Sequence, residues 1–359
     1  MTTLIDQQDA PPRDPSACHS GLFEVCVGVP DLDTSIDYFA RFGCKPGPRG
    51  KLARDAARRV YGVDSAVESV RLLHGNSDHG LVRLMRWDQP INAGLGVETH
   101  LRCVGSRWGT RLTSNVLGIA NHAQHALDCG EPLGMIEPLL DVIGEVAGGA
   151  PARAFLDPIV GVREMVVVQP LYRQVFFQRF GYDSPLYGTI DPDSMFQTSQ
   201  HTHFGLMIAT DDHSVFDFYD RTLGLKRWMD APTEYAKSRG GRAVYALPPG
   251  EGFHIVDFDD PRSGHSRDSR RSGKLKCIRL PGNAVITNKL DRSRAGCLGY
   301  SAYTWRCGDV HVMRERVTAA GATEVSAIVA DEFGAPALSF CAPDGYYWIL
   351  VQMTEGAVQ

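Results

Sequence analysis

The sequence predicts an α+β fold built from duplicated units. A strand-like segment beginning at His203 ends at Asp211, and an aromatic helical segment, Val215–Tyr219, follows it and closes at Gly224. The same order of strand, aspartate and helix occurs near the N-terminus, where Asp31 precedes Asp211 by 180 residues (211 − 31). A repeat at half the length of a 359-residue chain indicates that the two halves share an architecture.

The first half is interpreted as two units. Leu22–Val29 is a predicted strand, and Leu32–Phe42 is a predicted helix because its apolar residues recur at helical spacing. Val67–His74 and Leu81–Trp87 alternate between apolar and polar residues, which predicts strands. The second unit is expected to contain a strand at Thr110–Leu117, a helix at Ala120–Cys129 and a last strand at Arg163–Gln169.

The second half follows a segment, residues 171–200, that is expected to be an ordered linker because it is rich in aromatic residues. The third unit is predicted to run from Thr202 to about Asp260, with a helix at Ser214–Leu223 and strands at Arg242–Leu247 and Gly252–Phe258. The fourth unit is predicted to begin near Gly299, to have its helix at Val310–Ala320 and to finish at Gln352.

Two segments resemble one known family. The strand that begins at His203 runs into an aromatic helix, and Ala342–Gln352 places an apolar run after a Pro-Asp-Gly turn. Both resemble the vicinal oxygen chelate superfamily of glyoxalases, bleomycin-resistance proteins and extradiol dioxygenases. The resemblance implies four βαβββ modules, paired into two domains whose curved mixed sheets form a cleft lined by first and fourth strands. It identifies the fold better than the reaction.

This architecture gives an expected division of the chain. A flexible leader is expected at residues 1–20, followed by an N-terminal domain of two modules at 21–170, the second of them degenerate. After the linker at 171–200, a C-terminal domain of two modules at 201–353 is expected to hold the active cleft.

Two histidines are candidate metal ligands because they fall on strands expected to be neighbours. His203 lies on the first strand of the third unit, and His254 lies on the strand interpreted as its fourth. Neutral imidazole suits Fe, Mn, Ni, Co and Zn, and Glu251 or Glu24 could complete the site with a carboxylate. Two other outcomes remain open, a metal-free cleft that binds substrate and a purely structural role for the histidines.

Three further residues are candidates for catalysis. His201 lies two residues before His203 and could act as a base or a third ligand. Tyr303 and Tyr347 are expected to point into the same cleft, where a hydroxyl could donate a proton to substrate. The alternative is that both are ordinary strand aromatics, because tyrosine is favoured in strands whatever the function.

Composition excludes several classes of protein. The formal charge of −5 argues against a general nucleic-acid binder, and no apolar run approaches the roughly 20 residues that cross a bilayer. The nine cysteines form no Cys-x-x-Cys pair and fit free thiols in a cytoplasmic protein. No glycine-rich nucleotide motif occurs, so no nucleotide cofactor is expected. The expected partner is a small-molecule substrate, bound by a monomer or a homodimer.

Three functions remain possible from the sequence. The first is a metal-assisted lyase or isomerase acting on an oxygen-rich or aromatic metabolite, with the metal as a Lewis acid. The second is an extradiol ring-cleaving dioxygenase, which is disfavoured because Ser301 and Ile349 stand at the ligand positions of the fourth unit. The third is a metal-free protein of the resistance type that sequesters a drug or metabolite.

Overall fold

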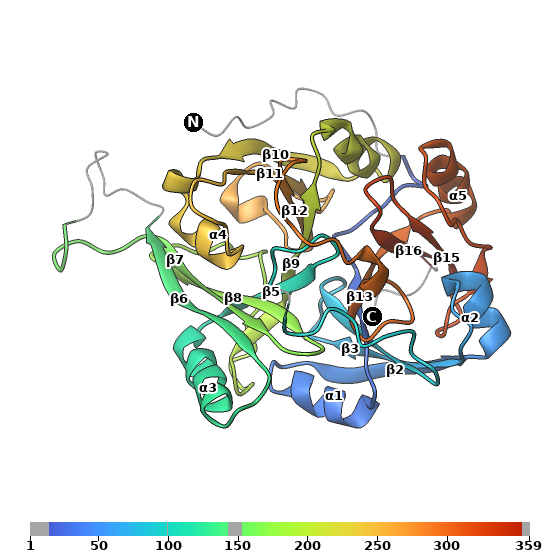
Figure 1. Cartoon of the computed structure of the whole chain (residues 1–359), viewed down its shortest axis with the longest axis horizontal. Coiled ribbons are helices and arrows are strands. Elements are labelled where there is room, and N and C mark those ends of the chain that lie inside the picture. The colour runs from blue at the N-terminus through green and yellow to red at the C-terminus, as the bar shows by residue number, and fades with distance from the viewer. Residues whose placement is uncertain (1–13, 99, 143–152, 354–359) are drawn as a thin grey trace.

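Two eight-stranded mixed sheets make up the protein (Figure 1). The computed structural model describes residues 14–98, 100–142 and 153–353. The first sheet has the strand order β14-β15-β16-β13-β1-β4-β3-β2, and the second has the order β10-β11-β12-β9-β5-β8-β7-β6. Each sheet combines two βαβββ-type modules, so the predicted α+β fold of four paired modules is confirmed.

Module one supplies half of the first sheet, and module two supplies half of the second sheet. Module one contains β1 (Glu24–Gly28), α1 (Leu32–Ala40), β2 (Lys45–Leu52), α2 (Arg54–Tyr61), β3 (Val67–Leu73) and β4 (Leu81–Trp87). Module two contains β5 (Arg107–Thr113), α3 (Val116–Asp128), β6 (Gly134–Val142), β7 (Gly161–Val168) and β8 (Arg173–Phe180).

The last two modules complete the sheets. Module three contains β9 (Thr198–Ala209), the 3₁₀ turn η1 (His213–Phe216), the π turn η2 (Phe218–Thr222), β10 (Lys226–Thr233), η3 (Tyr235–Lys237), α4 (Arg239–Val244), β11 (Phe253–Asp259), η4 (Arg267–Ser269) and β12 (Lys274–Leu280). After η5 (Leu290–Arg292), module four contains β13 (Gly299–Cys307), α5 (Val310–Ala319), β14 (Val329–Ala330), β15 (Pro336–Cys341) and β16 (Tyr347–Gln352).

The modules pair differently from the expected order. Module one joins module four through antiparallel β1 and β13, where Glu24 is opposite Thr304. Module two joins module three through antiparallel β5 and β9, where Thr110 is opposite His203. The expected pairing within 21–170 and within 201–353 is therefore wrong. The central strands of both sheets are almost wholly buried, and side-chain alternation alone does not specify which buried first strands meet.

The expected linker at 171–200 is also corrected. Its first part, Arg173–Phe180, is strand β8, which pairs with β5 and β7 at the centre of the second sheet. Some of the aromatic residues that distinguish 171–200 from a solvated linker lie in this strand. The expected leader lies partly outside the described residues. Its last residues are packed, since Cys18 is buried and its backbone forms an isolated antiparallel β-bridge with that of Cys307.

Module three departs most from its predicted elements. The predicted strand at Arg242–Leu247 overlaps helix α4, whose first turn is capped by the side chain of Ser238. The predicted helix at 214–223 is divided into a 3₁₀ turn and a π turn. A strand that was not predicted, β12, is the fourth strand of the module, and β11 is its third. This last change decides the geometry of the candidate site.

Aspartates begin two of the helices as expected. Asp31 accepts from the backbone N–H of Thr34 at 2.7 Å, and Asp309 accepts from His311 at 2.8 Å. In module three the capping residue is Asp212, whereas Asp211 accepts from the N–H of Gly282. Among the described residues, no helix is long and apolar enough to span a membrane.

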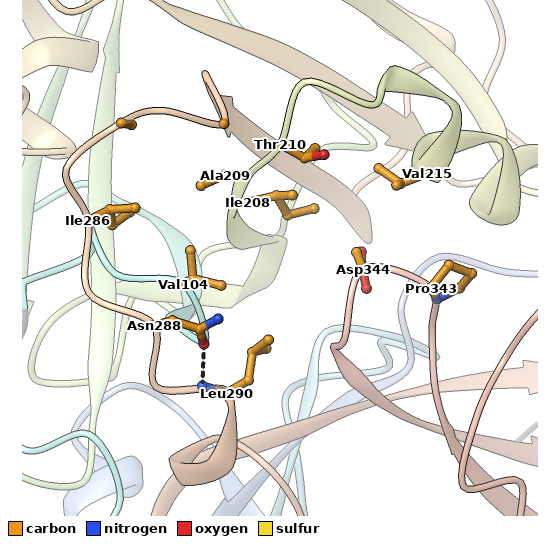
Figure 2. Close-up of a pocket in the computed structure, with 12 residues that line it drawn as sticks. Val104, Ile208, Ala209, Thr210, Val215, Ile286, Asn288, Leu290, Pro343 and Asp344 are labelled. Carbon is orange, nitrogen blue, oxygen red and sulfur yellow. Dashed lines mark hydrogen bonds between the residues drawn. The ribbon is translucent and has the colours of Figure 1, made fainter.

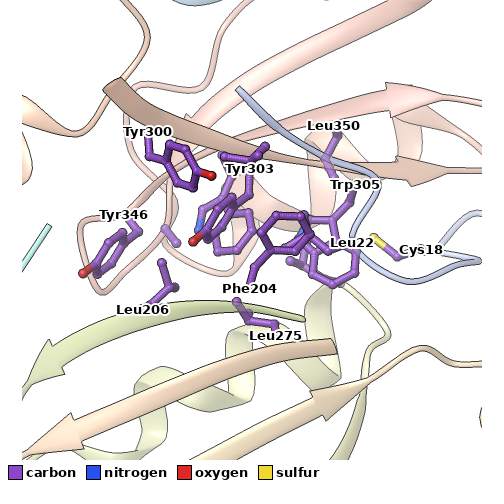
Figure 3. Close-up of a cluster of buried hydrophobic side chains, with 14 of the residues drawn as sticks. Cys18, Leu22, Phe204, Leu206, Leu275, Tyr300, Tyr303, Trp305, Tyr346 and Leu350 are labelled. Carbon is purple, nitrogen blue, oxygen red and sulfur yellow. The ribbon is translucent and has the colours of Figure 1, made fainter. Parts of the chain in front are cut away.

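A large apolar core joins the two sheets. Phe204, Leu206 and Leu275 of the second sheet pack towards Tyr303 and Trp305 of the first sheet (Figure 3). We call this side of each sheet its packing face and the opposite side its open face. Because side chains alternate along a strand, His203 lies on the open face when Phe204 lies on the packing face.

Candidate functional site

The open face of the second sheet contains a cavity of about 390 Å³. Its floor is formed by side chains of the central strands β7, β8, β9 and β12, with Trp228 of β10 and two loops at the rim. The lining residues are Val162, Glu164, Phe177, Arg179, Tyr182, Ser184, Tyr187, His203, Trp228, His265, Arg267, Arg270 and Lys274. We call this cavity the cleft. It lies beside the first strand β9 and the fourth strand β12, which are hydrogen-bonded neighbours.

Arg179 is the most unusual residue of the cleft. Its side chain is only 10% exposed, and within the described part of the chain its Nε and Nη1 atoms have no hydrogen-bond partner. The guanidinium lies over three aromatic rings, with distances to the centroids of Phe177, Tyr182 and Tyr187 between 5.0 and 5.5 Å. Its nearest carboxylate, Asp183, is 3.9 Å away. Buried donors without acceptors are costly, so this group needs an acceptor that the described residues do not supply.

The cleft is strongly cationic. Its lining contains one carboxylate, that of Glu164, and four cationic side chains. With neutral histidines the net charge of the lining is +3 (4 − 1). The four cations are Arg179, Arg267, Arg270 and Lys274. Two buried carboxylates beneath the lining offset part of this charge. Lys274 Nζ lies 2.9 Å from Asp257, and Arg270 Nη2 lies 3.1 Å from Asp259. The arrangement attracts anions to the cleft.

His203 faces the cleft as a neutral imidazole. Burial, with the cations Lys274, Lys276 and Arg179 nearby, holds the pKa of His203 well below its usual value. The Nδ1 atom lies 3.2 Å from the hydroxyl of Tyr187. If that hydroxyl donates to Nδ1, the ring proton resides on Nε2, which then acts as a further donor.

Glu164 provides a carboxyl group beside the cations. Burial raises the pKa of Glu164, although Lys276 acts in the opposite direction. Burial likewise lowers the pKa of Lys276, which is also 3.8 Å from Asp257. The two shifts bring the pKa values of Glu164 and Lys276 closer together than in solvent.

The structure does not bring the predicted metal ligands together. His254 lies on β11 opposite Arg279 of β12, whereas His203 lies on β9 opposite Lys274. The β12 partners of the two histidines, Lys274 and Arg279, are five residues apart, which is about 16 Å along the strand. His254 also belongs to the packing face. Glu251 forms an ion pair with Arg102 at 2.5 Å and does not line the cleft.

The predicted catalytic residues lie inside cores. His201 is fully buried, with its ring 5.0 Å from that of Phe204, because a register shift in the β5–β9 ladder turns it towards the packing face. Tyr303 is fully buried in the same core and donates to the carbonyls of Trp108 and Gly205. Tyr347 is buried on the other face of the first sheet, so the two tyrosines do not share a cleft.

Comparisons with solved structures identify the fold. A glyoxalase I mutant from Zea mays matches with a TM-score of 0.51 and 16% identity, covering 93% of this chain and 94% of its own. A candidate dioxygenase from Bacillus subtilis matches with a TM-score of 0.50 and 10% identity, covering 94% and 86%. The chain has the vicinal oxygen chelate fold. No family model matches it, and no curated protein sequence matches it significantly.

The vicinal oxygen chelate resemblance implies a divalent metal, and the residues of the cleft do not fit one. The single imidazole on its floor, His203, is surrounded by the cationic side chains of Arg179, Lys274 and Lys276. The buried carboxylate of Asp257 is already bound by both lysines. A divalent cation placed beside His203 would be repelled by three charges in a partly dehydrated site.

The other open face of this vicinal oxygen chelate fold is filled by a polar network. Glu24, the alternative carboxylate ligand, is fully buried there and is bound by Arg83 and Arg71. The hydroxyls of Tyr61 and Ser69 donate to Glu332, which closes the network. Glu24 therefore lies in a different sheet from His203, and its carboxylate is already neutralised.

A second cavity of about 390 Å³ lies at the edge of the packing face (Figure 2). Ile208, Val215 and Ile286 supply apolar walls, and Asp344 from the Pro-Asp-Gly turn reaches its rim. Asp344 accepts from the hydroxyl of Tyr219 at 2.5 Å and from the N–H of Tyr346 at 3.0 Å. These internal bonds give Asp344 a structural role, so the cationic cleft is the better candidate site.

Sequence reasoning missed the cleft residues other than His203. The signal was present in β12, where Lys274 and Lys276 alternate with the buried Leu275 and Cys277. The expectation that the third unit ends near Asp260 leaves β12 outside it, which hides this signal. Arg179 lies in β8, within the segment 171–200 that the sequence predicts to be a linker, so its position in a strand is not expected.

Proposed function

We propose that the protein binds a small organic anion with an aromatic or planar part in the cleft, and acts on it as a lyase or isomerase by acid–base chemistry. The observation that carries the proposal is Arg179, a buried guanidinium with two unpartnered donors. A carboxylate or phosphate group in the cleft would accept a charge-assisted hydrogen bond from one of these donors.

The remaining cleft residues fit the same ligand. Lys274 and the Nε2 of His203 add positive potential and a donor beside the bound acid group. At the rim, Arg270 lies 4.3 Å from the centroid of the Trp228 ring, so a cation and an aromatic ring stand together at the mouth of the cleft. Together these groups favour a flat ligand that has an anionic end.

Glu164 supplies the chemistry in this proposal. Its raised pKa makes it a stronger base than an exposed carboxylate. It would remove a proton from carbon next to the ligand's acid or carbonyl group and return it to another position. The adjacent cations Lys276 and Lys274 would stabilise the negative charge that develops on the ligand.

Binding can be tested by isothermal titration calorimetry with phenylpyruvate, benzoate and inorganic phosphate. Wild-type protein should bind phenylpyruvate, and Arg179→Met should weaken binding at least about tenfold, since a charge-assisted hydrogen bond contributes about 1.5–3 kcal/mol. Arg163→Met is a matched control. Arg163 also lies over an aromatic ring, that of Phe180, but does not line the cleft. Equal affinity in the wild type and Arg179→Met would contradict the proposal.

Catalysis can be tested separately by deuterium exchange. In D2O, wild-type protein should accelerate exchange at the carbon next to the 2-oxo group of phenylpyruvate, and Glu164→Gln should bind this probe without accelerating exchange. The second candidate function is sequestration without turnover, favoured by the three aromatic rings around Arg179. Binding that depends on Arg179, together with equal exchange in the wild type and Glu164→Gln, would establish that second function.

A further inference from the structure

Three potential metal ligands converge on the packing-face side of the second sheet, remote from the cleft. His213 of η1, Asp230 of β10 and His254 of β11 place one ligand atom each within 4.8 Å of one another. The register explains the convergence, because Asp230 is opposite Val256 and His254 is opposite Pro232. Asp230 and His254 are therefore diagonal neighbours on one face of the sheet. The turn η1 then places His213 above them.

The side chains already have the orientation that coordination requires. His213 Nε2 lies 2.8 Å from one carboxylate oxygen of Asp230, and His254 Nε2 contacts the other oxygen. The two imidazole rings are 5.1 Å apart at their centroids. Both Nε2 atoms thus face the same carboxylate, and a cation between them would replace two hydrogen bonds by metal–ligand bonds.

We propose that His213, Asp230 and His254 form a divalent transition-metal site that joins η1 to strands β10 and β11. Two neutral imidazoles and one carboxylate suit Zn²⁺, Co²⁺, Ni²⁺ or Fe²⁺. The remaining coordination positions would be taken by water, since the three side chains are 39%, 18% and 20% exposed. The site is independent of the proposed function, because the cleft lies on the opposite face of the sheet.

Surrounding charges favour a cation at this position. Arg227 lies 3.2 Å from Asp230, but it is also bound by Asp217 at 2.8 Å and Asp220 at 2.7 Å. Asp217 also binds Arg221 at 3.2 Å. The carboxylate of Asp230, shared with Arg227, therefore supplies the negative charge at the cluster itself.

The position in the fold gives such a metal a structural role. Strand β10 is the edge strand of the second sheet, and it pairs only with β11. The module's helical segment is irregular here, divided between the turns η1 and η2. A metal bound by all three elements would fix the edge strand and the turn to the interior strand. Metal binding should therefore raise the thermal stability of the folded protein.

Metal-depleted full-length protein provides the test, with Zn²⁺ followed by isothermal titration calorimetry and Co²⁺ by its visible absorption. We expect one Zn²⁺ per chain, and a Co²⁺ spectrum of nitrogen and oxygen ligands. His254→Gln and His213→Gln should each weaken Zn²⁺ binding at least about tenfold, because each removes one ligand. The melting temperature of the wild type should rise with Zn²⁺, and that of each variant should rise less.

His122→Gln is the matched control. His122 is exposed on α3 and lies outside the cluster, so its substitution should leave Zn²⁺ affinity unchanged. Far-ultraviolet circular dichroism of the metal-free variants checks that they remain folded. Absence of Zn²⁺ uptake by the wild type would overturn the proposal. Uptake that is equally strong in folded His254→Gln and His213→Gln would overturn it as well.

Discussion

The guanidinium of Arg83 and the carboxylate of Glu24 form a fully buried ion pair between the neighbouring strands β4 and β1. Arg83 Nε lies 2.6 Å from Glu24 Oε1. Burial alone would raise the pKa of Glu24, but Arg71 and Arg83 together hold it below its usual value. The pair occupies the open face of the first sheet, the counterpart of the face that forms the cleft in the second.

Removing one partner of this pair should be costly. Arg83→Met would leave the buried carboxylates of Glu24, Glu332 and Asp331 without their shared cation, and we expect a loss of about 3–5 kcal/mol in the free energy of unfolding. Urea denaturation measures the change. Arg86→Met is the control, since Arg86 pairs with Glu68 near the surface and should change stability by less than about 1 kcal/mol. Equal losses in both variants would contradict the assigned role of Arg83.

A second prediction concerns the close contact between Gly205 and Trp108. A Cβ atom at Gly205 would lie 1.9 Å from the indole of Trp108, so Gly205→Ala should destabilise the protein by about 1–3 kcal/mol. Adding Trp108→Phe should recover part of the loss, because a phenyl ring is smaller than the indole whose Cε2, Cζ2 and Nε1 atoms would clash. Gly134→Ala is the control, since its Cβ would be 3.8 Å from the nearest atom. Thermal melting of the wild type and these three variants tests this contact.

A third prediction follows from the position of Tyr303. Its hydroxyl lies 3.0 Å from the carbonyl oxygen of Trp108 and 2.8 Å from that of Gly205, and so links the first sheet to the second. Tyr303→Phe should cost about 1–2 kcal/mol of stability. Binding of phenylpyruvate should persist, because Tyr303 does not line the cleft. A variant with wild-type stability and no binding would show that the hydroxyl serves the ligand.

The sequence predicted much of the order of strands and helices because local patterns determine it. Asp31 and Asp309 cap helices through bonds to residues two or three positions later, which a single sequence displays. His203 was correctly expected on a first strand with an open face. These features depend on neighbours in the chain, so the alternation and capping signals were sufficient to locate them.

The candidate site could not be predicted as fully, because it depends on which strands become neighbours. Strand β12 was not predicted. Because β12 is the fourth strand of module three, His254 lies on the third strand, β11, and not beside the cleft. The register shift between Thr110 and Arg111 turned His201 into the core, although simple alternation places it beside His203. The convergence of His213 with Asp230 and His254 joins a turn to two strands, and no spacing in the sequence reveals it.

A final prediction concerns the dependence of stability on pH, through the buried His74. Burial, with repulsion from Arg111, lowers the pKa of His74 from 6.5 to about 4, and its Nε2 lies 3.0 Å from the carbonyl oxygen of Thr198. Between these two pH values the unfolded chain binds a proton that the folded chain does not bind. The stability contributed by His74 is therefore complete above pH 6.5 and is lost as pH falls towards 4. The shift corresponds to about 3 kcal/mol at most. Urea denaturation from pH 8 to pH 4 should show a steeper loss for the wild type than for His74→Gln, with parallel curves above pH 7.5. Parallel curves over the whole range would mean that His74 does not titrate abnormally in the folded protein.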